Sequence, residues 1–245
     1  MMRVCVLGNS HAAALKLAYD ADPSIATRME LTFFAHRGGA LRQLRARDGI
    51  IVPTKAEVEK AIAHTSGGLK QIDPALYDVF LVYGLGVRAY RPPMTFFSRA
   101  ARLQAARDHV SQSLAMPILD LLGGVGAAPI YVAHEPMMAS RRPQEPGRHP
   151  DYAAGIALLN EAVFNPRDSM LLEQPLETVV NGWETGNAFS IGSRRLDIGD
   201  KISGDLHQDA DHGHMNQEFG RIYLGMLADR LASPAARPQA AVAGG

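Results

Sequence analysis

Short apolar runs alternate with longer amphipathic stretches along the chain. The runs that predict strands are Arg3–Leu7, Glu30–Ala35, Val79–Tyr83 and Pro129–Ala133, with a weaker one at Glu177–Val180. Continuous apolar character, rather than alternation with polar residues, is typical of strands that are covered on both faces. Strands that alternate with helices along a chain predict an α/β fold with a mainly parallel central sheet.

Two stretches show helical periodicity. Apolar residues recur on one helical stripe between Phe96 and Leu122, and Pro117 is expected to kink or end that helix. Near the C-terminal end, residues from Met215 to Met226 repeat at helical spacing and predict a last helix that reaches about Leu231. The segments 141–150 and 183–209 are rich in Pro, Gly, Ser or Asp and predict exposed loops.

Composition indicates a packed globular chain. Of the 245 residues, 47% are hydrophobic and 20% are charged, which predicts one domain over residues 1–232. The segment 233–245 is rich in Pro, Ala and Gly and is expected to be a disordered tail. The single cysteine, Cys5, lies in the first predicted strand and is expected in the core. One cysteine excludes an intramolecular disulfide and a cysteine-rich metal site.

The charges balance, with 25 basic and 25 acidic residues. This balance predicts no nucleic-acid partner and no membrane partner, and it favours a small or neutral substrate. The arginines at positions 42, 45 and 47 are expected on a solvated helix face. A second basic patch at 141–149 is expected to be a solvated loop, and contact with an anionic substrate is the alternative. No apolar run is long enough for a secretory signal or a membrane helix, so a cytoplasmic location is expected.

The candidate chemistry lies at both ends of the chain. Gly8-Asn9-Ser10-His11 follows the first predicted strand, where a sharp turn into a helix exposes a serine well. Serine needs a base within hydrogen-bond reach, and histidine with a carboxylate partner suits that task. Asp211 and His214, just before the last predicted helix, supply this pair. In the alternative interpretation, Ser10 is a helix N-cap and the other two are ordinary residues at a helix start.

These two blocks resemble those of the SGNH (GDSL-like) hydrolase superfamily. The resemblance implies a three-layer α/β/α fold with a flavodoxin-like sheet. It also implies that Ser10 is the nucleophile, His214 the general base and Asp211 its orienting partner. Members of the superfamily are esterases, lipases, carbohydrate O-acetyl esterases and some acyltransferases.

The family's middle blocks are only partly present. Gly38-Gly39 resembles the family's glycine after the second strand, which implies an oxyanion hole made by N–H groups of Ser10 and of Gly38 or Gly39. The family's Gly-x-Asn-Asp after the third strand is missing, and Gly84-Leu85-Gly86 stands there instead. A backbone N–H group at Gly84–Gly86 is therefore a candidate replacement donor, as are Asn9 and Arg88. Asn9 also replaces the usual Asp of the first block.

Several polar residues near these blocks are expected to contact the substrate. They are Asn9, His11, Arg88, His134 and Glu135. His11 also suits a helix cap. The dipeptide at 134–135 suits an ordinary polar strand end equally well.

The sequence favours two other kinds of site less. A metal site would draw on the cluster His207, Asp209, Asp211, His212 and His214, with help from the dipeptide at 134–135. Residues this close in sequence cannot all face one ion, and no HExxH group occurs, so no metal is predicted. Nucleotide binding is not favoured because Gly-x-Gly-x-x-Gly and Gly-Lys-Ser/Thr are absent. The Gly123–Gly126 segment is interpreted as the end of a helix.

The sequence therefore predicts a serine esterase that hydrolyses a small or carbohydrate-linked acyl ester without a cofactor. Two alternatives stay open, namely acyl transfer to a glycan and a catalytically weak module that binds a glycan or a partner. The sequence does not indicate the acyl group, the alcohol or the oligomeric state.

Overall fold

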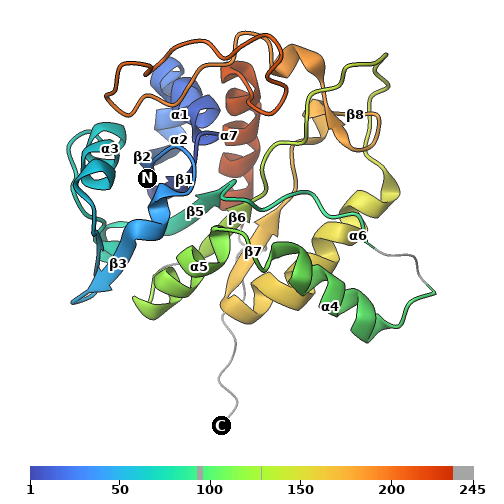
Figure 1. Ribbon diagram of the computed structural model, residues 1–245, viewed down its shortest axis with the longest axis horizontal. Helices are drawn as coiled ribbons and strands as arrows, with labels where there is room; N and C mark the ends of the chain where they lie inside the picture. Colours follow the sequence, from blue (N-terminus) through green and yellow to red (C-terminus); the bar gives the residue numbers. More distant parts are fainter. Residues whose placement is uncertain (93–95, 128, 234–245) are drawn as a thin grey trace.

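The computed structural model describes residues 1–92, 96–127 and 129–233. Its centre is a five-stranded sheet with the strand order β2-β1-β5-β6-β7, and all neighbouring strands are parallel (Figure 1). This is the doubly wound order of flavodoxin-like folds, with the order reversing between β1 and β5. The strands are β1 (Met2–Gly8), β2 (Met29–Ala35), β5 (Val79–Tyr83), β6 (Ile130–Ala133) and β7 (Ser169–Leu172).

Helices cover both faces of this sheet, so the three-layer α/β/α fold is confirmed. One face packs against α1 (Ala12–Ala21), α2 (Pro23–Arg28) and α7 (Gln217–Ala232). The other packs against α3 (Ala56–Ser66), α4 (Arg99–Val110), α5 (Ala115–Gly124) and α6 (Pro150–Leu159). Because successive side chains of a strand point to opposite faces, Val4 and Val6 pack on the first layer, while Cys5 and Leu7 pack on the second.

The shorter elements connect these layers. Two antiparallel pairs are β3 (Leu44–Arg47) with β4 (Ile50–Pro53), and β8 (Val179–Val180) with β9 (Glu184–Thr185). The 3₁₀ turns are η1 (Ala40–Gln43), η2 (Pro74–Leu76), η4 (Asn165–Arg167), η5 (Leu176–Thr178) and η6 (Asn187–Phe189). A π-helical turn, η3 (Asn160–Phe164), continues α6.

Helices α1 and α7 lie in direct backbone contact. Gly220 of α7 faces Ala14 of α1, and a Cβ atom at Gly220 would lie only 2.0 Å from the Ala14 carbonyl oxygen. Only glycine permits this approach. The close contact brings together the first turns of both helices, and with them the segments that precede each helix.

Three sequence predictions about elements are wrong. The expected helix over 96–122 is two helices, α4 and α5, because the chain leaves helical geometry after Val110. Pro117 does not break a helix, since it lies in the first turn of α5, where its missing N–H leaves no hydrogen bond unmade. The fifth central strand is β7, whereas the predicted strand at 177–180 contains η5 and the short strand β8.

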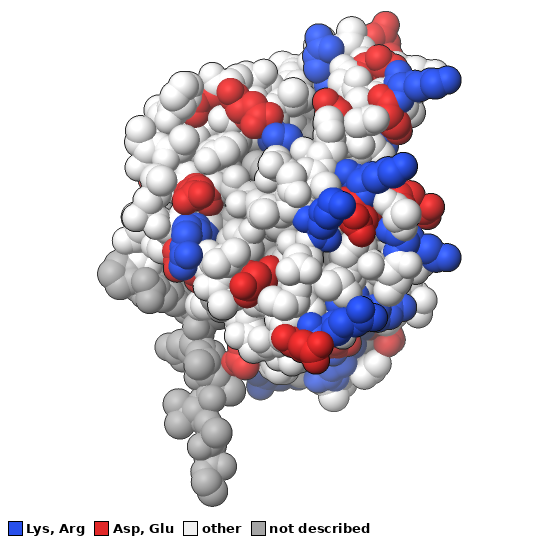
Figure 2. Space-filling view, turned by 90° about the vertical axis from the view of Figure 1, so that its left-hand side faces the viewer, with Lys and Arg blue, Asp and Glu red and all other residues white. Residues whose placement is uncertain are grey.

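The basic cluster also differs from its prediction. Arg42 lies in η1, and Arg45 and Arg47 lie on β3, so these residues do not share a helix face. The Asp48-Gly49 pair, with φ of 51° and 79°, makes the tight turn between β3 and β4. The face of the molecule that carries β3 and α3 shows acidic and basic side chains interspersed (Figure 2).

Other expectations have mixed outcomes. Cys5 is fully buried, as predicted. The last helix ends at Ala232, close to its predicted end. The predicted disordered tail falls almost entirely on residues 234–245, which lie outside the described residues. Within the described part of the chain, no helix is long and apolar enough to cross a membrane.

Candidate active site

Ser10, Asp211 and His214 meet at the carboxyl edge of the sheet. Ser10 lies in the turn between β1 and α1, and the other two lie just before α7. His214 Nε2 is 2.9 Å from Ser10 Oγ, and His214 Nδ1 is 2.8 Å from Asp211 Oδ2. The three side chains predicted from the two sequence blocks thus form one hydrogen-bonded chain, although Ser10 and His214 are 204 positions apart.

Hydrogen bonds surround the Asp211 carboxylate. Its Oδ1 accepts the backbone N–H groups of Gly213 and His214, at 2.9 and 3.1 Å. Its Oδ2 faces Nδ1 of His214 and also Nδ1 of His207, the latter at 2.9 Å. Burial raises the pKa of Asp211, but these hydrogen bonds outweigh it and bring the pKa to about 2. An ionised Asp211 keeps the proton of His214 on Nδ1, which leaves Nε2 free to accept the proton of Ser10.

The ring of His214 lies between two other imidazoles, and we call His11, His214 and His207 the histidine stack. The His11 ring lies 4.7 Å from that of His214 at an angle of 20°, and the His207 ring lies 4.0 Å away at 10°. Burial and the neighbouring His214 lower the pKa of His11 to about 3. The same two causes lower the pKa of His207. Neutral rings therefore flank the base on both sides and restrict its orientation.

His207 is the member of this group that the sequence interpretation missed as part of the serine site. The sequence interpretation includes it only among possible metal ligands, although its position four residues before Asp211 is a usable signal. In the described residues, His207, Asp211 and His214 offer atoms within 4.8 Å of one another, which is a possible metal-ligating set. However, the Nδ1 atoms of His207 and His214 both face Oδ2 of Asp211. This arrangement fits two N–H groups that donate to one carboxylate oxygen, and not two nitrogen atoms that coordinate a metal ion. Asp209 and His212 do not join the set.

The predicted oxyanion donors divide into two groups. The backbone N–H groups of Ser10, Gly38 and Gly39 find no acceptor among the described residues, so they remain available to a ligand. The N–H of Gly84 instead donates to the carbonyl oxygen of Ala133 at 2.9 Å, which extends the pairing of β5 with β6. The prediction that Gly84 supplies an oxyanion donor is therefore wrong.

Gly84 has a different task, which is to make room for Asn9. Its φ is +73°, and a Cβ atom there would lie 2.9 Å from Asn9 Oδ1. The buried Asn9 amide accepts the N–H of His11 at 3.1 Å and donates to Glu135 Oε1 at 3.3 Å. Glu135 Oε1 also accepts the N–H of Gly86 at 3.0 Å. Asn9 and Glu135 thus connect the loops that follow β1, β5 and β6, and little of Asn9 remains for a substrate.

His134 is not at the surface of the site, so its predicted substrate contact is wrong. The side chain is buried, and burial lowers its pKa. Its Nε2 is 2.6 Å from Tyr152 Oη, and its Nδ1 is 2.6 Å from the carbonyl oxygen of Glu135. Because the carbonyl oxygen of Glu135 can only accept, the neutral ring carries its proton on Nδ1, and Nε2 accepts the hydroxyl of Tyr152, whose oxygen also accepts the N–H of Gln174. Through this hydrogen bond to its backbone, the buried His134 helps to fix the position of Glu135.

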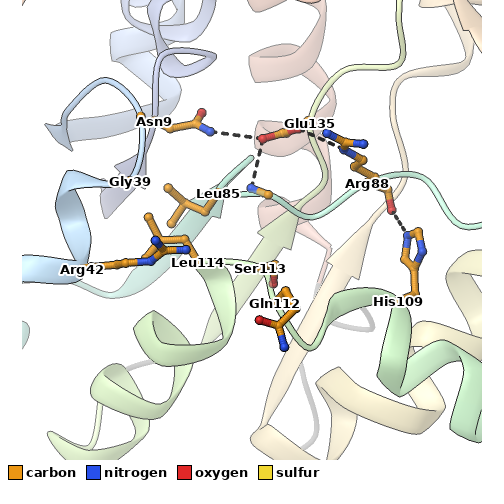
Figure 3. A pocket seen from close by; sticks show the side chains of 12 residues that line it. Asn9, Gly39, Arg42, Leu85, Arg88, His109, Gln112, Ser113, Leu114 and Glu135 are labelled. Atoms are coloured by element: carbon orange, nitrogen blue, oxygen red, sulfur yellow. Dashed lines mark hydrogen bonds and ion pairs between the residues drawn. The ribbon is translucent and has the colours of Figure 1, made fainter.

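Next to the hydrogen-bonded chain lies an open cavity of about 520 Å³ (Figure 3). Its wall includes Asn9 of the turn after β1, and Gly38 and Gly39 of the predicted oxyanion hole. Ser10 and His214 are not part of this wall. Arg88, whose side chain is 81% exposed, lines it with Nε 3.9 Å from Glu135 Oε2. The remaining lining residues are Arg42, Leu85, Gly86, His109, Gln112, Ser113, Leu114 and Glu135.

Comparisons with known proteins give little. No protein-family model matches the chain, and no curated protein was found to match it. Among solved structures, the lipopolysaccharide acetyltransferase periplasmic domain of Salmonella ser. Paratyphi A aligns with 95% of this chain and 84% of its own length, at a TM-score of 0.47 and 7% identity. The water-forming NADH oxidase of Lactobacillus brevis aligns with 70% of this chain and 46% of its own, at a TM-score of 0.18 and 12% identity. Likenesses of this size carry no functional argument.

Proposed function

We propose that this protein is a serine esterase of the SGNH type, which hydrolyses a small or carbohydrate-linked acyl ester. The observation that carries the proposal is the continuous hydrogen-bonded chain from Ser10 through His214 to Asp211. A serine with a histidine base and an orienting carboxylate is the arrangement that activates a hydroxyl for attack on a carbonyl. A residue set used only for binding has no need of all three groups in this order.

In the proposed cycle, Ser10 Oγ attacks the ester carbonyl carbon while its proton passes to His214 Nε2. The negative charge that forms on the carbonyl oxygen is stabilised by the free N–H groups of Ser10 and of Gly38 or Gly39. His214 then gives the proton to the leaving alcohol, and an acyl-serine remains. Water attacks this acyl group with His214 as the base, which releases the acid and restores Ser10. Asp211 stays ionised throughout and stabilises the imidazolium.

The histidine stack supports the first proton transfer. Because His11 and His207 are neutral near pH 7, neither opposes the positive charge that forms on His214. Their parallel rings also hold the base in the orientation in which Nε2 faces Ser10.

One oxyanion donor of the SGNH superfamily, the side-chain amide of an asparagine, has no counterpart in the proposed site. Gly86 stands where that family has an asparagine, and its N–H is used by Glu135. Losing one oxyanion donor costs about 3 kcal/mol of transition-state stabilisation. We therefore expect slow turnover of simple esters, with binding contacts elsewhere contributing to the rate on the natural substrate.

Acyl transfer to a sugar hydroxyl is the second candidate. The observation that favours it is the cavity of about 520 Å³ beside the free N–H groups, which is large enough for an acceptor as well as an ester. The covalent step is the same, and an acceptor alcohol takes the place of water in the second half of the cycle.

Labelling with a fluorophosphonate, followed by intact-mass measurement, tests the proposal. We expect one adduct per wild-type chain and none with Ser10→Ala or His214→Ala. Ser111→Ala is the matched control, because Ser111 is an exposed serine whose hydroxyl donates to the carbonyl of Asp108, and it should label like the wild type. A folded wild-type protein that takes no label would overturn the proposal. With an acetyl ester and added glycans, free acetate indicates hydrolysis and acetylated glycan indicates transfer.

A further inference from the structure

The cavity beside Ser10 has an unusual distribution of charge. Arg42 of η1, Arg88 of the loop after β5 and His109 of α4 all line it, and Glu135 is the one acidic residue among the described residues of its wall (Figure 3). The lining thus combines two guanidinium groups and an imidazole with one carboxylate.

The single carboxylate is already engaged by its neighbours. Glu135 Oε1 accepts the N–H of Gly86 at 3.0 Å and the amide of Asn9 at 3.3 Å. His11 Nε2 lies 3.7 Å from the same oxygen, and Arg88 Nε lies 3.9 Å from Oε2. Glu135 therefore offers little to a ligand, and the long distance to Arg88 leaves the other donors of that guanidinium free.

Arg42 is differently placed. Among the residues that the structure describes, no carboxylate forms an ion pair with it. Its guanidinium lies against Gly39, since a Cβ atom at Gly39 would be 3.6 Å from Arg42 Nη1. The free charge therefore lies next to a backbone N–H that is proposed to bind the oxyanion.

A buried polar group also lines this cavity. Ser113 is 9% exposed, and its hydroxyl has no hydrogen-bond partner within the described residues. Buried hydroxyl groups without partners are rare in folded proteins because desolvation costs free energy that a hydrogen bond would recover. The exposed amide of Gln112 adds a neutral donor to the two guanidinium groups of the lining.

We infer that this cavity binds an acidic group of the substrate, so that the ester carries a carboxylate or a phosphate close to the scissile bond. Arg42 supplies the main charge and Arg88 the second, because planar guanidinium groups pair well with either kind of anion. The inference rests on the proposed function for the position of the ester itself. It defines the class of substrate as acyl esters of acidic sugars or of other small acids.

Three aryl acetates test the inference. They are 4-acetoxybenzoate, 4-acetoxyphenyl phosphate and the neutral 4-acetoxybenzamide. In the double variant Arg42→Ala/Arg88→Ala, kcat/KM for an anionic ester should fall about tenfold further than kcat/KM for the neutral one. Comparing protein variants on the same esters cancels the intrinsic reactivity of each leaving group. A larger fall for the phosphate ester than for the benzoate ester identifies phosphate as the preferred anion, and the reverse identifies carboxylate.

Matched variants distinguish direct contact of the cavity arginines with the anion from a general effect of positive surface charge. Arg47→Ala removes an exposed arginine of β3 that does not line the cavity, so the ratio of anionic to neutral kcat/KM should not change. Arg42→Lys keeps the charge without the bidentate geometry and should retain part of the preference. An equal fall for anionic and neutral esters in the double variant would overturn the inference.

Direct binding distinguishes this inference from the proposed function. In titration calorimetry, 4-hydroxybenzoate or inorganic phosphate should bind the wild type about tenfold more tightly than the double variant. Fluorophosphonate labelling of Ser10 without any such difference would leave the esterase proposal intact and refute the anion site. A difference in anion binding between the wild type and the double variant, without labelling of Ser10, would support the anion site and refute the esterase proposal.

Discussion

The loops that follow β1 and β5 lie side by side at the carboxyl edge of the sheet, and they contribute in opposite ways. The β1 loop, residues 9–11, carries three polar side chains, all of which take part in hydrogen bonds or ring stacking at the site. The β5 loop, residues 84–88, has no polar side chain before Arg88, and it supplies space and one N–H group. Both follow the strands between which the sheet reverses its order, where folds of this kind bind ligands.

The difference teaches how a site can depend on a loop that does no chemistry. Gly84 leaves room for Asn9, and Gly86 holds the carboxylate to which Asn9 donates. Asn9 in turn accepts the N–H of His11 and so fixes the turn that presents Ser10. Residues 84–86 of the β5 loop therefore act on Ser10 through Asn9, whereas the β1 loop is proposed to act on the substrate directly.

The largest expected effect is on the β1 loop. Ser10→Ala should lower kcat for an activated acetyl ester by about 10⁴-fold or more, because the nucleophile is removed while the base and oxyanion donors remain. The midpoint of urea unfolding should change little, since within the described residues the Ser10 hydroxyl makes one hydrogen bond, that to His214. Steady-state kinetics and a urea titration of the same preparations provide the check. Activity within tenfold of the wild type would mean that the β1 loop does not carry the chemistry.

On the β5 loop we expect a loss of stability. Gly84→Ala combines a positive φ with a clash against Asn9, whereas Gly192→Ala has a similar φ of +71° and no atom within 4 Å. Gly192→Ala should lower the free energy of unfolding by about 1 kcal/mol, and Gly84→Ala by about 1–3 kcal/mol more. Urea unfolding of both variants isolates the contact with Asn9. Equal losses would show that Gly84 makes no room for that side chain.

The link between the two loops is tested by Asn9→Asp. This change places a second carboxylate 3.3 Å from Glu135 and removes the amide donor, so stability at neutral pH should fall by about 1–3 kcal/mol. Adding Glu135→Gln should restore a donor and an acceptor and recover most of the loss. A double-mutant cycle from urea unfolding measures the coupling. Additive effects of the two changes would contradict the link.

The last expected effect is a change in pH dependence, which leaves activity and stability at neutral pH unaltered. The pKa of His11 is about 3 in the native protein and 6.5 without the fold, so only the unfolded chain takes up a proton between these values. Native stability should therefore fall as pH decreases from 6.5 toward 4.5, by up to about 1.4 kcal/mol per pH unit from this group. His11→Phe should reduce this slope and keep a ring against His214, while His207 still contributes in the same direction. An unchanged slope would mean that His11 titrates normally.

The sequence was sufficient for most of the sheet. Four of its five strands were predicted because β1, β2, β5 and β6 are mainly apolar runs. The fifth, β7, has only four residues at the edge of the sheet, and its short sequence does not stand out from the surrounding helix and turn. The division of 96–122 into two helices was missed because the apolar stripe continues across the break.

For the site, sequence blocks predicted which residues meet but not how backbone groups are used. Ser10, Asp211 and His214 lie within hydrogen-bond distance as the blocks suggested, and their catalytic roles stay predictions. The N–H of Gly84 is engaged because β5 pairs with Ala133, a long-range contact that a glycine motif does not encode. The stacking of His207 on His214 depends likewise on the path of the 207–214 segment.

The separation of 204 positions between Ser10 and His214 also sets when the proposed activity could begin during synthesis. At about 5–20 residues per second, a ribosome needs roughly 10–40 s to proceed from the serine to the histidine. Through that interval the β1 loop has no base, and α1 lacks the helix that packs against it. On the proposed function, the nascent chain therefore remains inert until both the β1 loop and the segment with His214 have been made and have come together.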